Sequence, residues 1–378
     1  MPRIHLGPFF TSSLLLVAAF ILYRNADVAF GSSVKGFKQV VLNNQQHFES
    51  VKTSDEGEGF TRSIVAVGDL HGDYENALHV LNMANVVDKE GNWTGDIDLF
   101  VQTGDIIDRG TDTIKLYVWL EQLRSQARAA GGDVVSHLGN HEWMNLLYMS
   151  IHKKSKRLGS ESPFPGSSSQ LVYDPSKGLS SVDYDPSAAQ NNPLSHAALS
   201  FVHGGLAPSY KHLSPYPSAI NEIGASLLRR LQSRPMPPPH PPAPYPGLPA
   251  DATDDERGLY ADDGPLWYRG WAFKKEEEVC AEVDEVLEKT GVRRLIMGHT
   301  PNFEHIQNRC GGKVIIIDTG ISHAYGGALS ALSVRYSLKP DLNDATRWKE
   351  SEIVTALYLD REEVLVEQVR EITNKPVS

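Results

Sequence analysis

Short runs of apolar residues recur along the chain from Ser63 onward, and a polar turn that contains glycine follows each run. Apolar runs of this length without alternating polar residues are typical of strands that are buried on both faces of a sheet. We therefore expect strands at Ile64–Val67, Leu99–Val101, Val134–Val135, Leu199–Val202, Leu295–Met297 and Val314–Ile317.

Longer helix-like segments separate these runs. They are Tyr74–Ala84, Thr113–Ala130, Asn221–Leu231 and Lys274–Lys289. Alternation of strands and helices predicts an α/β layered domain. In such folds the polar groups that follow the strands gather at one edge of the sheet, which is where we expect a functional site.

Two stretches interrupt this alternation. Residues 153–193 are rich in Ser, Pro and Asp, and residues 234–249 read RPMPPPHPPAPYPGLP, which is typical of an extended polyproline segment. We interpret them as insertions, at about 153–193 and 232–256, in a domain that spans 63–370. The proline-rich segment at 234–249 has an alternative reading as a docking arm for a proline-recognising partner.

The N-terminus carries an apolar run at residues 9–23, with Arg3 before it and Arg24 after it. About 15 residues is short for a membrane span and typical of the apolar part of a signal peptide. We interpret residues 1–31 as a signal peptide or a signal-anchor, which would be a membrane tether, and residues 32–62 as a polar tether. Both readings predict the secretory pathway or a membrane-anchored domain on the lumenal or extracellular side. Because basic residues flank the run on both sides, a cytoplasm-facing orientation stays open.

Composition excludes several classes of protein. The 378 residues have a net charge of −11, which argues against binding to a nucleic-acid backbone. Two cysteines cannot make a disulfide scaffold or a four-thiolate zinc site. We expect Cys280 and Cys310 to be free thiols, with a disulfide between them as the alternative if the chain is secreted.

Six polar side chains follow the predicted strands, each beside a glycine. They are Asp69, His71, Asp105, Asn140, His203 and His299. Carboxylate, amide oxygen and imidazole together suit divalent Mn, Fe or Zn. A central aspartate such as Asp105 has two oxygens and can bridge two ions. Two-metal sites suit phosphoester cleavage, because one ion activates water while both neutralise the developing charge.

A single Asp or His after a strand is usually a turn or capping residue, and we interpret Asp73 and Asp318 in that way. By contrast, the six side chains named above belong to five short motifs in a fixed order. These are GDLHGD at 68–73, GDIIDRG at 104–110, GNHE at 139–142, HGG at 203–205 and GHT at 298–300. Five ordered motifs are far more specific than one glycine-rich loop.

On these motifs the chain resembles the calcineurin-like metallophosphoesterases, and within them the PPP-type protein phosphatases. GPLWYRG at 264–270, DTGIS at 318–322 and AYGG at 324–327 are similar to the Shewanella-like branch. The resemblance covers roughly Ser63 to Tyr336 outside the two interrupting stretches. It implies an α/β metallophosphoesterase sandwich of two central β-sheets flanked by helices.

The resemblance also implies a ligand set for two divalent metal ions. Asp69, His71 and Asp105 would hold the first ion. Asp105, Asn140, His203 and His299 would hold the second. The reaction it implies is in-line attack on phosphorus by a metal-bound hydroxide, and we expect no phospho-enzyme because no activated cysteine lies beside the motifs.

The remaining roles follow from charge and reach. His141, beside Asn140, is the candidate general acid, and the resemblance makes Asp108 the carboxylate that orients it. Arg109 would bind phosphoryl oxygens in a bidentate manner. Arg269 is either a second phosphate contact or part of a structural salt bridge. Asn140 is also placed at the substrate, and Glu142 is interpreted as structural.

The function that the resemblance implies is a phosphatase acting on phosphomonoesters of phosphoproteins, with phosphoserine, phosphothreonine and phosphotyrosine all open. A dinucleoside-polyphosphate hydrolase shares the five motifs and is the first alternative. A non-catalytic scaffold is the second. PPP-type phosphatases of animal cells carry a tyrosine-containing motif after the last strand, and the sequence leaves open whether Tyr325 replaces that tyrosine.

Overall fold

The computed structural model describes residues 59–149, 167–168, 170–173, 197–233, 248–341, 343–344 and 347–373. The predicted signal or anchor at 1–31, nearly all of the tether at 32–62 and most of the proline-rich segment lie outside these residues. Within the described ranges, no helix combines the length and the apolar character that crossing a bilayer requires.

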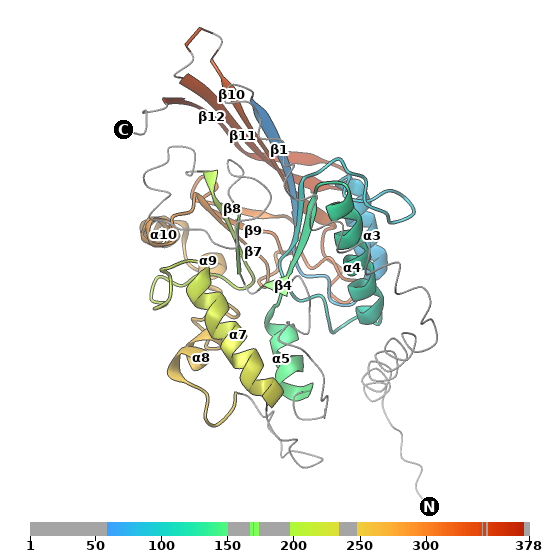
Figure 1. Cartoon of the computed structure of the whole chain (residues 1–378), viewed down its shortest axis with the longest axis vertical. Helices are drawn as coiled ribbons and strands as arrows, with labels where there is room; N and C mark the ends of the chain where they lie inside the picture. The colour runs from blue at the N-terminus through green and yellow to red at the C-terminus, as the bar shows by residue number, and fades with distance from the viewer. Residues whose placement is uncertain are drawn as a thin grey trace, which may run out of the picture. The chain divides into compact units, whose positions relative to one another are not determined.

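A seven-stranded sheet forms the first layer of strands, in the order β12-β11-β10-β1-β2-β3-β4 (Figure 1). Its strands are β1 (Phe60–Val67), β2 (Leu99–Gln102), β3 (Asp133–His137), β4 (Ser167–Ser168), β10 (Ser330–Pro340), β11 (Arg347–Tyr358) and β12 (Glu362–Thr373). The half from β1 to β4 is parallel, whereas β10, β11 and β12 are antiparallel.

A five-stranded sheet forms the second layer, in the order β5-β6-β7-β9-β8. Its strands are β5 (Gln170–Tyr173), β6 (Leu199–Val202), β7 (Arg294–Met297), β8 (Gln307–Arg309) and β9 (Val314–Ile316). Strands β6, β7 and β9 are parallel, so their carboxyl ends point the same way. All six strands expected from the apolar runs are present in the two sheets. Strands β4 and β5 come from the stretch interpreted as the first insertion, and each lies at an edge of one sheet.

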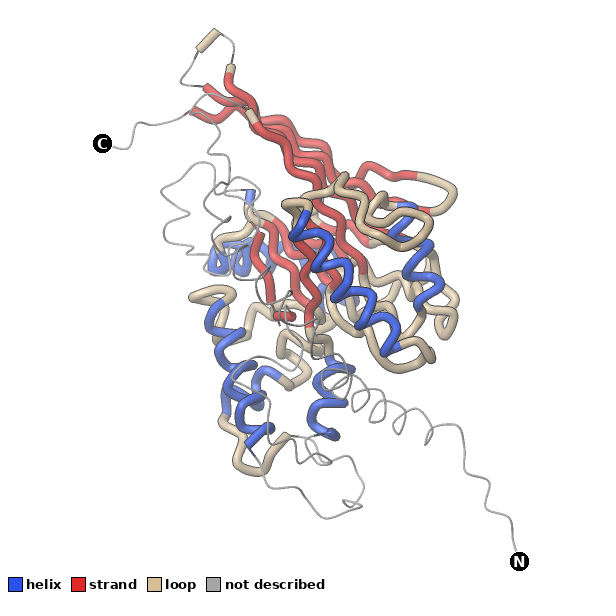
Figure 2. Tube along the Cα trace, turned by 45° about the vertical axis from the view of Figure 1, so that its right-hand side comes forward, coloured by secondary structure: helices blue, strands red, loops and turns tan. Residues whose placement is uncertain are grey.

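The helices are α3 (Tyr74–Met83), α4 (Thr113–Ala129), α5 (Asn140–Met149), α7 (Ser218–Ser233), α8 (Asp254–Leu259), α9 (Gly270–Phe273) and α10 (Glu276–Thr290). Helices α3 and α4 cover the seven-stranded sheet and α10 covers the five-stranded sheet, whereas α5, α7 and α8 gather below the ends of the strands (Figure 1 and Figure 2). The four helix-like segments of the sequence correspond to α3, α4, α7 and α10.

Successive side chains of β1 show why the layers form. Val65 and Val67 pack with α3 and α4 in one buried cluster, whereas Ile64 and Ala66 pack against the second sheet in another. A strand that is apolar on both faces must be covered on both faces, which explains the run without alternation. The order of layers is therefore helices, sheet, sheet, helices, and the expected sandwich of two sheets flanked by helices is confirmed.

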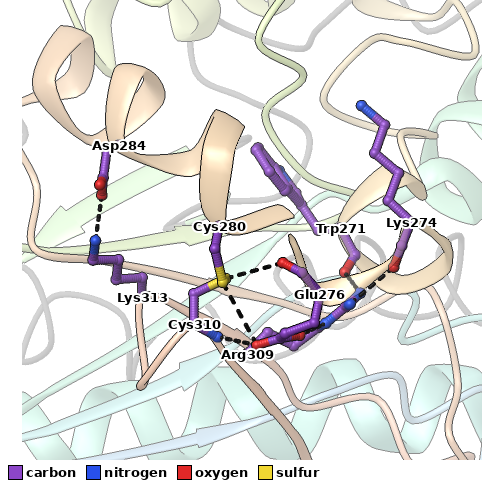
Figure 3. Close-up of a disulfide and its surroundings, with 8 residues drawn as sticks. All are labelled: Trp271, Lys274, Glu276, Cys280, Asp284, Arg309, Cys310 and Lys313. Carbon is purple, nitrogen blue, oxygen red and sulfur yellow. Dashed lines mark hydrogen bonds and ion pairs between the residues drawn. A yellow bond between two sulfur atoms is a disulfide. The ribbon is translucent and has the colours of Figure 1, made fainter. Parts of the chain in front are cut away.

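The two cysteines form a disulfide, with a Cα–Cα distance of 5.3 Å between Cys280 in α10 and Cys310 after β8 (Figure 3). The expectation of free thiols was therefore wrong, and the alternative is the one observed. Glu276 supports the same junction, because its Oε1 accepts the N–H of Cys310 at 2.6 Å and its Oε2 accepts Arg309 Nε at 2.7 Å. Arg309 also donates to the carbonyl of Lys274 at 2.8 Å, so this corner joins α9, α10 and the second sheet.

Candidate metal centre

The carboxyl ends of five strands bring the six predicted ligands together. Asp69 and His71 follow β1, Asp105 follows β2, Asn140 begins α5 after β3, His203 follows β6 and His299 follows β7. Each of the six is at most 4% exposed. Five of the six side chains line a cavity of about 330 Å³. The sixth, His203, lies within ion-pair distance of Asp105, which lines that cavity.

Asp105 lies at the centre of this group. Its Oδ2 is 3.9 Å from Nε2 of His71, and its Oδ1 is 3.4 Å from Nε2 of His203. The ligand atoms of Asp105, His203 and His299 lie within 4.8 Å of one another, and the same holds for Asp105 with His71 and His141. Asp105 is thus shared by two clusters of nitrogen ligands. A carboxylate in this position can serve two ions at once.

The histidine tautomers also suit a metal. Nδ1 of His71 is hydrogen-bonded to the carbonyl of Ile107, and Nδ1 of His203 to the carbonyl of Thr103, each at 2.9 Å. A carbonyl accepts only from an N–H, so Nδ1 of each ring carries a proton. Burial lowers the pKa of His71, so its Nε2 faces Asp69 and Asp105 without a proton. Nε2 of His203 lies 2.9 Å from Oδ1 of Asn140 and 3.4 Å from Oδ1 of Asp105. Metal-binding histidines are oriented by this kind of outer contact.

His299 gives the most direct indication that the centre takes a cation. It is 4% exposed, and its Nε2 has no hydrogen-bond partner. Burial, with the nearby His203 and Arg269, lowers the pKa of His299 to about 2. A neutral, buried and unpaired imidazole nitrogen is an unfavourable arrangement that coordination would relieve. The donor set therefore fits divalent ions.

Carboxyl groups crowd the same cavity. Burial raises the pKa of Asp69 well above its ordinary value, and the charges of Asp318 and Asp105 raise it further. Within the described part of the chain, no lysine or arginine forms an ion pair with these three; their histidine partners are His71, His141 and His203. Three buried carboxyl groups that only histidines face leave negative charge in the cavity, which bound cations would balance.

The backbone at the site is held in an uncommon conformation. The left-handed region is occupied by His71 (φ 43°), Asp105 (φ 55°), Asp108 (φ 68°), Arg109 (φ 68°) and His299 (φ 67°). Such conformations are unfavourable for side-chain-bearing residues and cluster at functional sites. Gly139 shows how tightly the loops approach, because a Cβ there would clash with Oδ1 of Asp105. This close approach explains the glycine of the GNHE motif.

Glu142 fixes the loop that carries Asp105. Its carboxylate accepts hydrogen bonds from the backbone N–H groups of Asp105, Ile106, Ile107 and Gly139, at 2.7 to 3.2 Å. Burial raises the pKa of Glu142 to about 7, and the charge of Asp105 acts in the same direction. Glu142 does not line the cavity, and its contacts are those of a structural residue.

His141 and Asp108 form a pair at the cavity. Nδ1 of His141 lies 2.7 Å from Oδ2 of Asp108, and Asn145 Nδ2 donates to the same oxygen at 3.0 Å. Burial works against a charged imidazole, but the hydrogen bond to Asp108 and the charge of Asp105 outweigh it and raise the pKa of His141. Nε2 of His141 lies 3.9 Å from Asp105 Oδ2, so His141 is also within reach of the ligand group.

Two arginines line the cavity. Arg109 is exposed, and its guanidinium carbon lies 5.9 Å from the centre of the Tyr325 ring. Arg269 donates through Nη1 to the carbonyl of His299 at 3.0 Å and to Thr300 Oγ1 at 3.3 Å. Arg269 is therefore held beside a predicted ligand by a carbonyl and a hydroxyl group.

Five residues that line the cavity were not assigned to the site from the sequence: Met144, Trp267, Pro301, Asp318 and Tyr325. Asp318 had been interpreted as a turn residue, and its Oδ1 does accept the N–H of Gly320 at 2.9 Å. Its carboxyl group is nevertheless 3% exposed and faces the cavity. Asp73, interpreted in the same way, is confirmed as a capping residue, because it accepts the N–H of Asn76 at the start of α3.

Comparison with known proteins places this fold and site in a class. A family model described as calcineurin-like phosphoesterase matches residues 62–303, which is more than half of the chain. The chain belongs to the calcineurin-like phosphoesterase family and is an enzyme that hydrolyses phosphoesters.

Individual relatives agree with this assignment. An uncharacterized protein of Schizosaccharomyces pombe is 36% identical over 72% of this chain and 76% of its own length. Shewanella-like protein phosphatase 2 of Arabidopsis thaliana is 28% identical over 68% of this chain and 71% of its own, which confirms the resemblance to that branch. In fold, the chain is similar to a mutant cold-active protein tyrosine phosphatase, with a TM-score of 0.52, 23% identity and 80% of each chain covered.

Proposed function

We propose that this metallophosphatase uses two divalent metal ions to hydrolyse phosphomonoesters on proteins. The position of Asp105 carries the proposal, because its two oxygens face His71 on one side and His203 on the other. Two ions bound there would activate the attacking water and neutralise charge on the phosphoryl group. Mn, Fe and Zn all suit a set of carboxylate, amide and imidazole ligands.

The chain's own residues have separable tasks. Asp69, His71 and Asp105 would hold one ion, and Asp105, Asn140, His203 and His299 the other. His141, kept protonated by Asp108, would give its proton to the leaving oxygen. Arg109 and Arg269, with the amide of Asn140, would bind the phosphoryl oxygens from the cavity walls.

The names of the relatives support a phosphoprotein substrate. The Arabidopsis thaliana relative is named a protein phosphatase, and the protein with the similar fold is named a protein tyrosine phosphatase. The cavity has a volume of about 330 Å³, and the aromatic side chains of Tyr325 and Trp267 line it together with the predicted ligands. We propose phosphoserine, phosphothreonine or phosphotyrosine residues of proteins as the substrate class.

We propose further that the chain enters the secretory pathway through residues 1–31. The apolar run at 9–23 and the Cys280–Cys310 disulfide support this, because disulfides persist in oxidising compartments. Sequencing of the mature N-terminus and cell fractionation would test it. A soluble cytosolic protein with its first residues intact would refute it.

A substrate panel on metal-stripped and metal-refilled protein tests the proposed reaction. Phosphoserine, phosphothreonine and phosphotyrosine peptides are compared with diadenosine tetraphosphate, and Asp105→Asn is the inactive control. We expect metal-dependent release of phosphate from at least one peptide and little turnover of the dinucleotide. Faster turnover of diadenosine tetraphosphate would favour a dinucleoside-polyphosphate hydrolase, and no turnover with any metal would favour a non-catalytic protein.

A further inference from the structure

Asp318 is a buried carboxylate at the metal centre to which the family's ligand set gives no task. It follows β9 in the second sheet, and the first sheet approaches it at the end of β1. There a Cβ on Gly68 would lie only 2.8 Å from the Cα of Asp318. The two sheets thus deliver Asp69 and Asp318 to the same wall of the cavity.

The two carboxyl groups are in direct contact. Oδ1 of Asp318 accepts the N–H of Gly320 at 2.9 Å, and the carboxyl group lies against that of Asp69, whose pKa its charge acts to raise. Asp69 in turn accepts the N–H of His299 through its Oδ1 at 3.0 Å. A continuous set of contacts therefore leads from the turn after β9, through Asp318 and Asp69, to the loop that carries His299.

Two independent features of this wall favour a cation. The unpartnered Nε2 of His299 is buried beside it. Asp69, Asp105 and Asp318 are each at most 3% exposed and have no lysine or arginine partner within the described residues. Three such carboxyl groups in one cavity repel one another unless positive charge lies between them.

We propose that Asp318 is a positioning residue for the metal centre, which orients Asp69 and adds a third negative charge beside the ion that Asp69 binds. This inference rests on the proposed two-metal site. Groups that orient a metal ligand commonly change affinity by about 10-fold to 100-fold when they are replaced. Asp318 is therefore expected to affect the binding of one ion more than that of the other.

Calorimetric titration of the metal-stripped full chain with Mn²⁺ tests the proposal. Asp318→Asn removes the charge with little change in shape. Asp73→Asn is the matched control, because Asp73 is also a buried carboxylate and holds the same 318–327 loop through its bond to the N–H of His323 at 2.7 Å. We expect wild type and Asp73→Asn to bind two ions alike, and Asp318→Asn to bind one of them about 10-fold to 100-fold more weakly.

Melting temperatures separate this role from a purely structural one. Without metal, Asp318→Asn should melt at or above the temperature of the wild type, because one of three mutually repelling acidic groups is gone. Saturating Mn²⁺ should raise the melting temperature of Asp318→Asn by less than it raises that of the wild type. A metal-free variant that melts lower while its Mn²⁺ affinity is unchanged would overturn the proposal.

The outcomes also distinguish the proposed two-metal function from the proposed role of Asp318. A wild-type chain that binds no Mn²⁺ would refute the two-metal function itself. A wild-type chain that binds two ions, with Asp318→Asn equal to it, would refute only the role of Asp318. If Asp318→Asn does not fold, Asp318→Ser serves for the same titration.

Discussion

Nδ1 of His141 lies 2.7 Å from Oδ2 of Asp108, and this pair raises the pKa of His141 although burial opposes a charged ring. The relationship matters for catalysis because a general acid must be protonated at the working pH. His141 lines the cavity, and Asp108 lies behind it in the left-handed region of the backbone.

Replacing Asp108 should therefore impair proton delivery. Asp108→Asn is expected to lower kcat on a phosphoserine peptide by about 10²-fold to 10⁴-fold. The loss on p-nitrophenyl phosphate should be smaller, since its leaving group needs little protonation. The basic limb of the pH profile should move to lower pH, because a charge that raised the pKa of His141 is gone.

Asp112→Asn is the matched control for this variant. Asp112 precedes α4, and its side chain makes no capping hydrogen bond. Its replacement should leave kcat on both substrates and the pH profile unchanged. Equal losses on the two substrates in Asp108→Asn would show that Asp108 does not act through a general acid.

Glu142 should determine the stability of the Asp105 loop. Glu142→Gln places an amide group opposite four backbone N–H donors and leaves some of them without an acceptor. We expect the free energy of unfolding of the metal-free chain to fall by about 2 to 4 kcal/mol, measured by urea denaturation. Glu75→Gln, on an exposed position of α3, should change it by less than about 0.5 kcal/mol. An unchanged midpoint for Glu142→Gln would contradict this role.

A buried ion-pair network joins the second sheet to β11. Glu352 accepts Arg294 Nη2 at 2.7 Å and Arg293 Nη1 at 3.0 Å. Removing its charge leaves two buried guanidinium groups undercompensated, so Glu352→Gln should lower the unfolding free energy at pH 7 by about 3 kcal/mol. Chemical denaturation measures this, and Glu367→Gln on an exposed position of β12 is the control.

The stability that Glu352 contributes should depend on pH. Burial acts to raise the pKa of Glu352, but Arg294 and Arg293 outweigh it and lower the pKa below its ordinary value of 4.5. A lowered folded-state pKa contributes stability that is present above the unfolded-state value and is lost as the pH falls through the folded-state value. The difference between wild type and Glu352→Gln should therefore be largest near neutrality and shrink below about pH 4. A constant difference across that range would count against the network.

The disulfide should contribute stability without affecting the metal centre. Cys280 and Cys310 are separated by 30 residues, and a crosslink over such a loop stabilises a chain by about 3 kcal/mol. The double variant Cys280→Ser with Cys310→Ser should unfold at a lower urea concentration and bind Mn²⁺ as the wild type does. Under reducing conditions the two proteins should become equal. A persistent difference in reductant would mean that the serines themselves disturb the corner.

The sequence predicts the central strands well because they are buried on both faces. In the run Leu199–Val202, for example, all four residues are buried and Ser200 is the single polar one. The long strands β10, β11 and β12 were not anticipated. Strands β10 and β11 alternate buried positions with partly buried or exposed ones, and β11 and β12 are rich in charged residues. These three strands therefore lack the continuous apolar run by which the others were found.

The residues of the site likewise divide into those that the sequence identifies and those that it does not. Asp69, His71, Asp105, Asn140, His203 and His299 stand out because each belongs to a motif with a glycine at a close backbone approach. Asp318 has the same neighbours as an ordinary turn aspartate and does form a turn bond to Gly320. Its proximity to Asp69 depends on how the two sheets meet, and no local pattern encodes that. The pairing of the two cysteines depends on the same kind of distant approach.

The central claim is that two cations lie around Asp105, and anomalous diffraction from crystals of the full chain grown with excess Mn²⁺ tests it most directly. The account predicts two anomalous peaks in the cavity, one beside His71 and Asp69 and one beside His203 and His299, with Asp105 between them. A cavity without peaks, or manganese bound only elsewhere on the chain, would contradict it.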